Sequence, residues 1–187
     1  GINIYSSKQI AGIRRFGLMR HNSNTVYAKM HNKFMIIDAD STENAWIMGG
    51  STNFSSNMID DPNNMIFIQD QSLARAYRVE FEEMWGSNGA QPNASESKFG
   101  ETKSNNTPHK FIVNGDDVEL YFSPSDGSTS KIIETIEAAD ASVLFSTLVF
   151  TRDDIAEAQR NDKFCSDLIY FFMRKPYQLI QFKPTTS

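Results

Sequence analysis

The chain has 187 residues, and its 40% hydrophobic content is enough for the core of one or two small domains. A single cysteine, Cys165, excludes an internal disulfide and any cysteine-based metal cluster. No apolar run is long enough to span a bilayer, so we expect no transmembrane segment.

The net charge of −5 is unevenly distributed along the chain. Residues 1–37 hold six basic residues and no acidic one (+6), whereas the remainder holds 12 basic and 23 acidic residues (−11). A basic segment favours an anionic substrate, although a solvated loop with chance charge would show the same composition. The acidic remainder makes tight, non-specific binding of nucleic acid less favourable.

Up to residue 85, apolar periodicity predicts strands followed by a helix. The pattern indicates a helix end at 10–13, a strand region at 26–38, and short strands at 45–48 and 65–68. It also predicts a helix over 72–85, closed by Gly86. Apolar residues recur there at helical spacing and predict a packed face: Leu73, Tyr77, Phe81, Met84 and Trp85.

Residues 86–109 are rich in Ser, Asn, Gly and Pro and are predicted to form a linker. Asn114-Gly115 then predicts a hairpin between strands at 111–113 and 118–122. Further elements follow in this order: a helix at 129–139 with Ile132, Ile133 and Ile136 on one face, a buried strand at 142–150, and a helix from Arg152 capped by Thr151. No pattern assigns residues 163–187.

The most informative pattern is His31-Asn32-Lys33, followed by Asp38 and later by Gly50-Ser51-Thr52-Asn53. Because side chains alternate along a strand, His31 and Lys33 are expected on one face of the sheet. A glycine turn can bring Ser51 and Asn53 to the same point. Lys33 would supply charge, Ser51 and Asn53 neutral donors, and His31 a nucleophile or proton carrier for a tetrahedral anion. A chance His-x-Lys pair and an ordinary Gly-Gly-Ser turn are the alternative interpretation.

H-x-K-x4-D followed by G-S-x-N resembles the HKD motif of the phospholipase D superfamily. Two departures accompany the resemblance. The gap between Asp38 and Gly50 is longer than usual, which indicates a longer hairpin turn. Many members of the family carry a glutamate shortly after the G-S-x-N turn, and here Asn63 is the nearest match.

The resemblance implies an α/β fold, a mixed-sheet sandwich flanked by helices and built from two repeats. Residues 1–85 would form the C-terminal part of the first repeat, with the motif, and 86–109 the linker. Residues 110–162 would open a second repeat, because Ser123-Pro124 before an Ile-rich helix is similar to a repeat opening.

The resemblance also implies a phosphodiesterase that forms a phosphohistidine on a phospholipid or another phosphodiester and uses no metal or cofactor. His31, Lys33 and Asp38 would be catalytic, Lys33, Ser51 and Asn53 would bind phosphate, and Gly50 and Asn63 would support them. Asp38 would orient His31 or Lys33, or is simply a turn residue.

Family enzymes pair two HKD motifs, and this sequence contains one. We expect the second from downstream sequence or from a homodimer partner, and little activity from the monomer. A nuclease of the same fold and a non-catalytic phosphate-binding or interaction module are the alternatives. The resemblance favours a secreted or periplasmic bacterial protein, although the composition fits a cytosolic one equally well.

Overall fold

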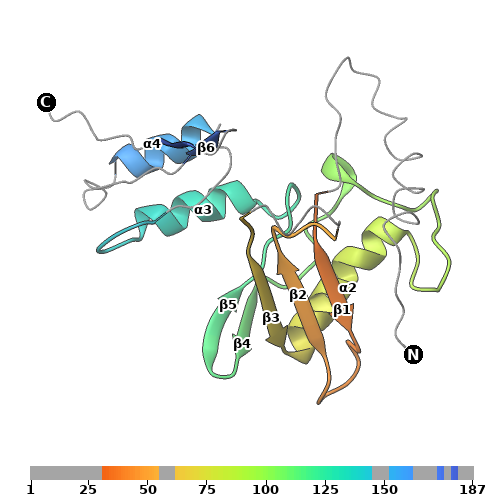
Figure 1. The fold of residues 1–187 in the computed structure, drawn as a ribbon. Coiled ribbons are helices and arrows are strands. Elements are labelled where there is room, and N and C mark those ends of the chain that lie inside the picture. Colours follow the sequence, from red (N-terminus) through yellow and green to blue (C-terminus); the bar gives the residue numbers. More distant parts are fainter. Residues whose placement is uncertain (1–30, 55–61, 145–151, 162–171, 175–177, 181–187) are drawn as a thin grey trace, which may run out of the picture. The chain divides into compact units, whose positions relative to one another are not determined.

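The computed structural model describes residues 31–54, 62–144, 152–161, 172–174 and 178–180 (Figure 1). The chain divides into two compact units, residues 1–126 and 127–187. The motif and its surroundings belong to the first unit. The predicted helix end at 10–13 and the first part of the predicted strand 26–38 lie outside the described residues.

The first unit is built on a three-stranded antiparallel sheet. Its strands are β1 (Phe34–Ile37), β2 (Trp46–Gly50) and β3 (Met65–Gln69), and β2 lies in the middle. The strands predicted at 45–48 and 65–68 are therefore confirmed, each with slightly different ends. Helix α2 (Gln71–Trp85) lies across one face of the sheet (Figure 1).

Helix α2 begins and ends where its capping residues require. The Asp70 carboxylate accepts a hydrogen bond from the backbone N–H of Leu73 (2.7 Å), which satisfies one of the free donors of the first turn. Gly86 adopts a left-handed conformation (φ 76°), and its N–H donates to the carbonyl of Glu82. The predicted helix and its glycine cap are both confirmed.

The hairpin consists of β4 (Lys110–Val113) and β5 (Asp116–Glu119). Asn114 and Gly115 both have positive φ angles, 52° and 92°, as a two-residue hairpin turn with matching twist requires. The predicted hairpin is confirmed, but its second strand ends at Glu119 instead of residue 122.

One apolar core joins the sheet, helix α2 and the hairpin. Its buried members come from all three elements and from the segments that flank them: Ala39, Ala45, Ile47, Leu73, Ala74, Ala76, Phe111, Leu120 and Phe122. Residues 86–109, predicted as a linker, contain a short 3-10 helix, η3 (Gly100–Thr102), and lie in the same compact unit as the sheet. The proposed repeat boundaries remain a prediction.

The second unit contains α3 (Ser128–Glu137), α4 (Asp153–Asn161), and an antiparallel pair formed by β6 (Phe172–Arg174) and β7 (Gln178–Ile180). Both predicted helices are confirmed, and β6 and β7 lie in the region left unassigned. On the predicted isoleucine face of α3, Ile136 is buried and Ile133 packs against the same cluster, whereas Ile132 stays 43% exposed.

The prediction of a strand at 142–150 needs correction. Residues 142–144 are not in a strand, and Leu144 is 86% exposed, since no strand of the described residues pairs with this segment. Residues 145–150 lie outside the described part of the chain.

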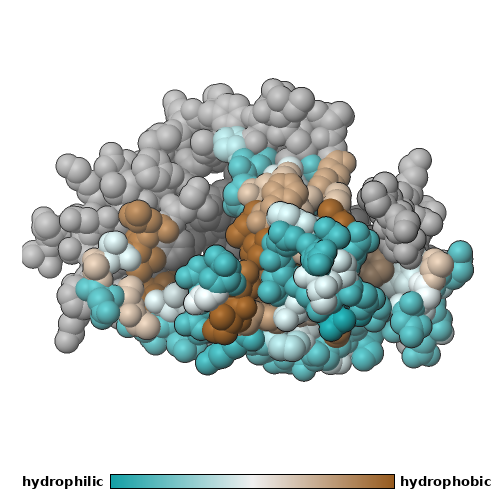
Figure 2. Space-filling model, turned by 90° about the horizontal axis from the view of Figure 1, so that it is seen from below, coloured by the Kyte–Doolittle hydropathy of each residue, from teal (hydrophilic) through white to brown (hydrophobic). Residues whose placement is uncertain are grey.

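Apolar side chains also remain on the surface, where they form brown areas between hydrophilic ones (Figure 2). Several of them are on the sheet of the first unit: Met35, Met65, Ile66 and Phe67 are each more than two-fifths exposed. Among the described residues, no helix combines the length and the apolar character that crossing a membrane requires.

Candidate active site

The predicted site residues lie at one end of the sheet. Phe34 pairs with Gly49 and Gly50 pairs with Met65, so the start of β1, the end of β2 and the start of β3 are neighbours. His31 and Lys33 lead directly into β1, whereas Ser51 and Asn53 follow β2. The turn after β2 therefore returns to the same end of the sheet as the His-x-Lys segment.

The strand prediction around the motif needs correction. β1 begins at Phe34, so His31 and Lys33 precede it and the alternation of a strand does not decide which way they face. The first pair of the β1–β2 ladder is Phe34 with Gly49, whereas Gly50 and Ser51 contact only the β3 side, at Met65 and Asn64. Within the described sheet, the central strand is β2 instead of the motif-bearing strand.

Lys33 folds back onto its own segment. Its ammonium group donates to the carbonyl oxygen of His31 (2.6 Å). Partial burial lowers the pKa of the Lys33 amine. His31 is exposed to solvent.

Ser51 is fixed by the residues that precede β3. Its hydroxyl donates to the side-chain carbonyl of Asn63 (3.0 Å) and accepts from the backbone N–H of Asn64 (3.0 Å). Its own N–H donates to the Asn64 carbonyl oxygen (3.1 Å). Asn63 thus contacts Ser51 at the position where many family members carry a glutamate, and Asn53 lies exposed two residues beyond.

Gly50 allows this close approach of the two segments. It has a φ of 148°, and a Cβ atom at this position would overlap the backbone carbonyl of Asn64. Only glycine accepts both constraints at no cost, which explains why the G-S-x-N turn begins with it.

We expect Gly50→Ala to lower the free energy of unfolding by about 1–3 kcal/mol, because the backbone must leave its angle or displace Asn64. Urea unfolding would measure it. Gly89→Ala is the matched control, because no atom lies within 4 Å of a Cβ there and its φ is not positive. Equal stability changes in the two variants would contradict this role of Gly50.

Asp38 lies away from the other motif residues. It follows the last residue of β1, at the strand end opposite His31, about 13 Å along an extended chain from the start of the strand. Its φ is positive (44°), and its carbonyl accepts from the N–H of Ser41 (2.8 Å). This geometry favours a turn residue over one that orients His31 or Lys33.

Sequence reasoning missed Glu80, a buried carboxylate on α2 that contacts the motif. Only 1% of its surface is exposed, and its Oε1 accepts from the side-chain amide of Asn32 (3.2 Å) and pairs with Lys103 Nζ (2.7 Å). Burial raises the pKa of Glu80, and the hydrogen bond and charge of Lys103 oppose that rise. A glutamate seven residues after Leu73 falls on the packed face of the helix, which is the pattern that could have identified it.

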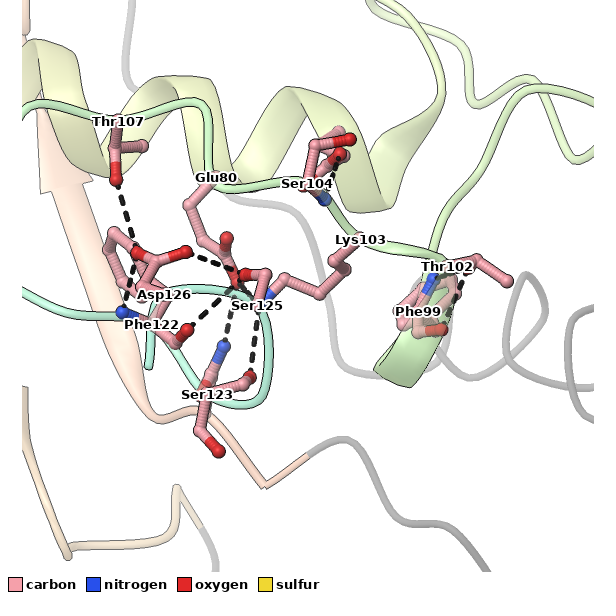
Figure 3. Close-up of polar contacts among 12 residues, drawn as sticks. Glu80, Phe99, Thr102, Lys103, Ser104, Thr107, Phe122, Ser123, Ser125 and Asp126 are labelled. Carbon is pink, nitrogen blue, oxygen red and sulfur yellow. Dashed lines mark hydrogen bonds and ion pairs between the residues drawn. The ribbon is translucent and has the colours of Figure 1, made fainter. Parts of the chain in front are cut away.

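The loop after β5 completes this environment. Lys103 Nζ donates to the carbonyl of Ser123 (3.0 Å), and the buried Asp126 carboxylate accepts from the N–H of Phe122 (2.8 Å) and from the Ser125 hydroxyl (2.7 Å) (Figure 3).

Three aromatic rings, one of them from this loop, pack against one another in edge-to-face or tilted arrangements. The rings of Phe34 and Tyr77 lie 5.3 Å apart, and those of Tyr77 and Phe122 5.1 Å apart. Phe34 directly follows Lys33, so the packed rings hold the start of β1 against α2 and the loop.

The chemistry of the site is therefore one imidazole, one ammonium group, and neutral hydroxyl and amide donors at a sheet end. Among the described residues, no group of three or more His, Cys, Asp or Glu side chains could hold a metal ion. Such a set of donors suits an anion with several oxygen atoms, such as a phosphate diester.

Comparison with known proteins gives a family for residues 3–85, somewhat less than half of the chain. Residues 3–85 match the family model described as cardiolipin synthase, phospholipase D-like domain. The matched segment spans His31, Lys33, Ser51, Asn53 and the whole of α2, and it belongs to the phospholipase D superfamily. Members of this family are typically phosphodiesterases, so the domain indicates a function on phosphodiesters. No curated protein and no solved structure matches the chain.

Proposed function

We propose that the protein is a phosphodiester hydrolase that acts through a phosphohistidine, with a phospholipid as the favoured substrate class. The observation that carries the proposal is the meeting of His31, Lys33 and the Ser51 turn at one sheet end within a phospholipase D-like domain. His31 is the nucleophile or the general acid, and a second histidine takes the other role.

The proposed reaction has two steps. An imidazole nitrogen attacks phosphorus, the bond from phosphorus to the leaving oxygen breaks, and the second histidine gives that oxygen its proton. Water then attacks the phosphohistidine, loses a proton to the same second histidine, and releases the phosphate monoester and free imidazole. Lys33 offsets the charge on the phosphate oxygens and Asn53 donates a hydrogen bond to them. Ser51 also donates to them, once its hydroxyl turns away from Asn63.

Two alternatives rest on specific observations. A nuclease of the same fold is favoured by the +6 charge of residues 1–37 and disfavoured by the acidic remainder. A non-catalytic phosphate-binding module is favoured by the single H-x-K motif and by Asn63 in place of the usual glutamate.

Radiolabelled substrates separate the three functions. The test uses an assembly with two motifs, which is either a longer polypeptide that carries both or a homodimer of this chain. This assembly is incubated with a phospholipid whose headgroup diester carries ³²P and is then quenched rapidly. An acid-labile, alkali-stable label on the protein is the expected result. Faster cleavage of an oligonucleotide than of the lipid would support the nuclease, and saturable binding without cleavage would support the module.

Diester turnover is expected to continue in excess EDTA at a rate within about twofold of the untreated enzyme. The reason is that Lys33 provides the positive charge for which many phosphoryl-transfer enzymes use a cation. Initial rates measured before and after dialysis against the chelator test this. Loss of the activity with EDTA, and its return with a divalent cation, would contradict the proposed role of Lys33.

A further inference from the structure

The buried ion pair between Glu80 and Lys103 contacts the motif through Asn32. Both side chains are almost fully enclosed, with exposed fractions of 1% and 3%. Removing two charges from water costs several kcal/mol per ion, and hydrophobic residues of similar size would often serve stability as well or better. Core stability alone is therefore a weak explanation for charges at these two positions.

The ion pair has a third partner, which is part of the motif. Glu80 Oε1 accepts from Asn32 Nδ2 (3.2 Å), and Asn32 stands between His31 and Lys33. Residues 31–33 belong to no strand of the described part of the chain, and this hydrogen bond ties the His-x-Lys segment to helix α2. Lys103 pairs with the same oxygen, Glu80 Oε1, and also donates to the Ser123 carbonyl (Figure 3).

We propose that Glu80 is a positioning residue, which holds Asn32 and thereby sets the place of His31 and Lys33 at the end of the sheet. Lys103 pairs with the same Glu80 oxygen that accepts from Asn32 and so fixes the carboxylate beside Asn32. The segment around η3 thus contributes to the site through Lys103, although it lies far from the motif in sequence. This inference rests on the proposed function for its kinetic test, and a second measurement tests it independently.

Two double variants separate positioning from packing. Glu80→Leu with Lys103→Met replaces the pair by apolar groups and removes the acceptor for Asn32, and it is expected to fold with a similar or higher thermal midpoint. Glu80→Gln with Lys103→Met also removes both charges but keeps a carbonyl oxygen for Asn32. Lys98→Met is the control, because it breaks an ion pair between the same helix and the same segment, that of Lys98 with Glu83, away from Asn32.

In the assembly with two motifs, Glu80→Leu/Lys103→Met should lower kcat by about 10- to 100-fold with KM within twofold, because a displaced nucleophile loses rate more than binding. Glu80→Gln/Lys103→Met should recover most of that kcat, and Lys98→Met should match the wild type. A folded Glu80→Leu/Lys103→Met variant with wild-type kcat would overturn the inference.

NMR of the 187-residue chain gives the independent measurement. The side-chain amide signals of Asn32 and the ring signals of His31 should shift in Glu80→Leu/Lys103→Met and stay in place in Lys98→Met. Unchanged signals in both would overturn the inference. Absence of any diesterase activity from the wild-type assembly, together with the expected NMR shifts, would instead overturn the proposed function and leave the positioning role intact.

Discussion

Replacing His31 with alanine in the assembly with two motifs is expected to lower diester turnover by about 10²- to 10⁴-fold, because the reaction loses its nucleophile or its proton donor. The thermal midpoint should change little. His31 is exposed and precedes β1, so its side chain contributes little buried surface. Initial rates and thermal unfolding of the same preparation provide the two measurements.

His109→Gln is the matched control for this variant. The His109 ring stacks on Tyr121 with the centroids 4.4 Å apart, and its Nδ1 lies 2.9 Å from the carbonyl oxygen of Leu120. We expect some loss of stability and full turnover, the reverse of the His31→Ala result. A His31→Ala protein that keeps most of its diesterase activity would rule out the catalytic role.

Elements whose determinants are local in sequence were predictable. Helix α2 carries its apolar spacing, its Asp70 cap and its Gly86 cap within one continuous stretch, and the hairpin depends on Asn114-Gly115. Periodicity and turn chemistry act over a few residues, so they can be recognised without knowing what else the chain contacts.

The start of β1 was predicted wrongly because it depends on a distant segment. The pairing of β1 with β2 begins at Phe34 and Gly49, and the next residue, Gly50, has a positive φ and approaches Asn64 on the β3 side. Asn and Lys are uncommon in strands, and residues 31–33 belong to no strand of the described sheet. Asp38 lies in the turn that follows the other end of β1, away from His31.

Glu80 was missed because its partners are far away in the sequence. Lys103 lies in a polar segment with no apolar periodicity, and composition alone predicts a solvated linker there. A charged residue on the packed face of a helix indicates a buried partner without identifying it. The candidate site could thus be predicted as a set of motif residues, but the residues that hold the set in place could not.

The structure bears on where the second histidine of the reaction comes from. An in-line displacement needs a nucleophile on one side of phosphorus and a proton donor to the leaving oxygen on the other, so a single imidazole cannot easily perform both tasks in one step. The sequence has one H-x-K motif, and His109 is engaged with Tyr121 and Leu120.

We therefore expect the 187-residue chain, held dilute as a monomer, to bind vanadate weakly and to hydrolyse diesters at most about 1% as fast as an assembly with two motifs, because it lacks one of the two acid–base groups. Activity should appear when a second motif is supplied, either in the same polypeptide or by a symmetric dimer that brings two copies of His31 together.

In the dimer case, the rate per chain should rise with protein concentration in parallel with the dimer fraction measured by sedimentation. Mixing wild-type chains with excess His31→Ala chains should then suppress the rate, since mixed dimers contain one histidine. Full turnover by a strictly monomeric chain would contradict the two-histidine mechanism and require another proton donor for the leaving oxygen.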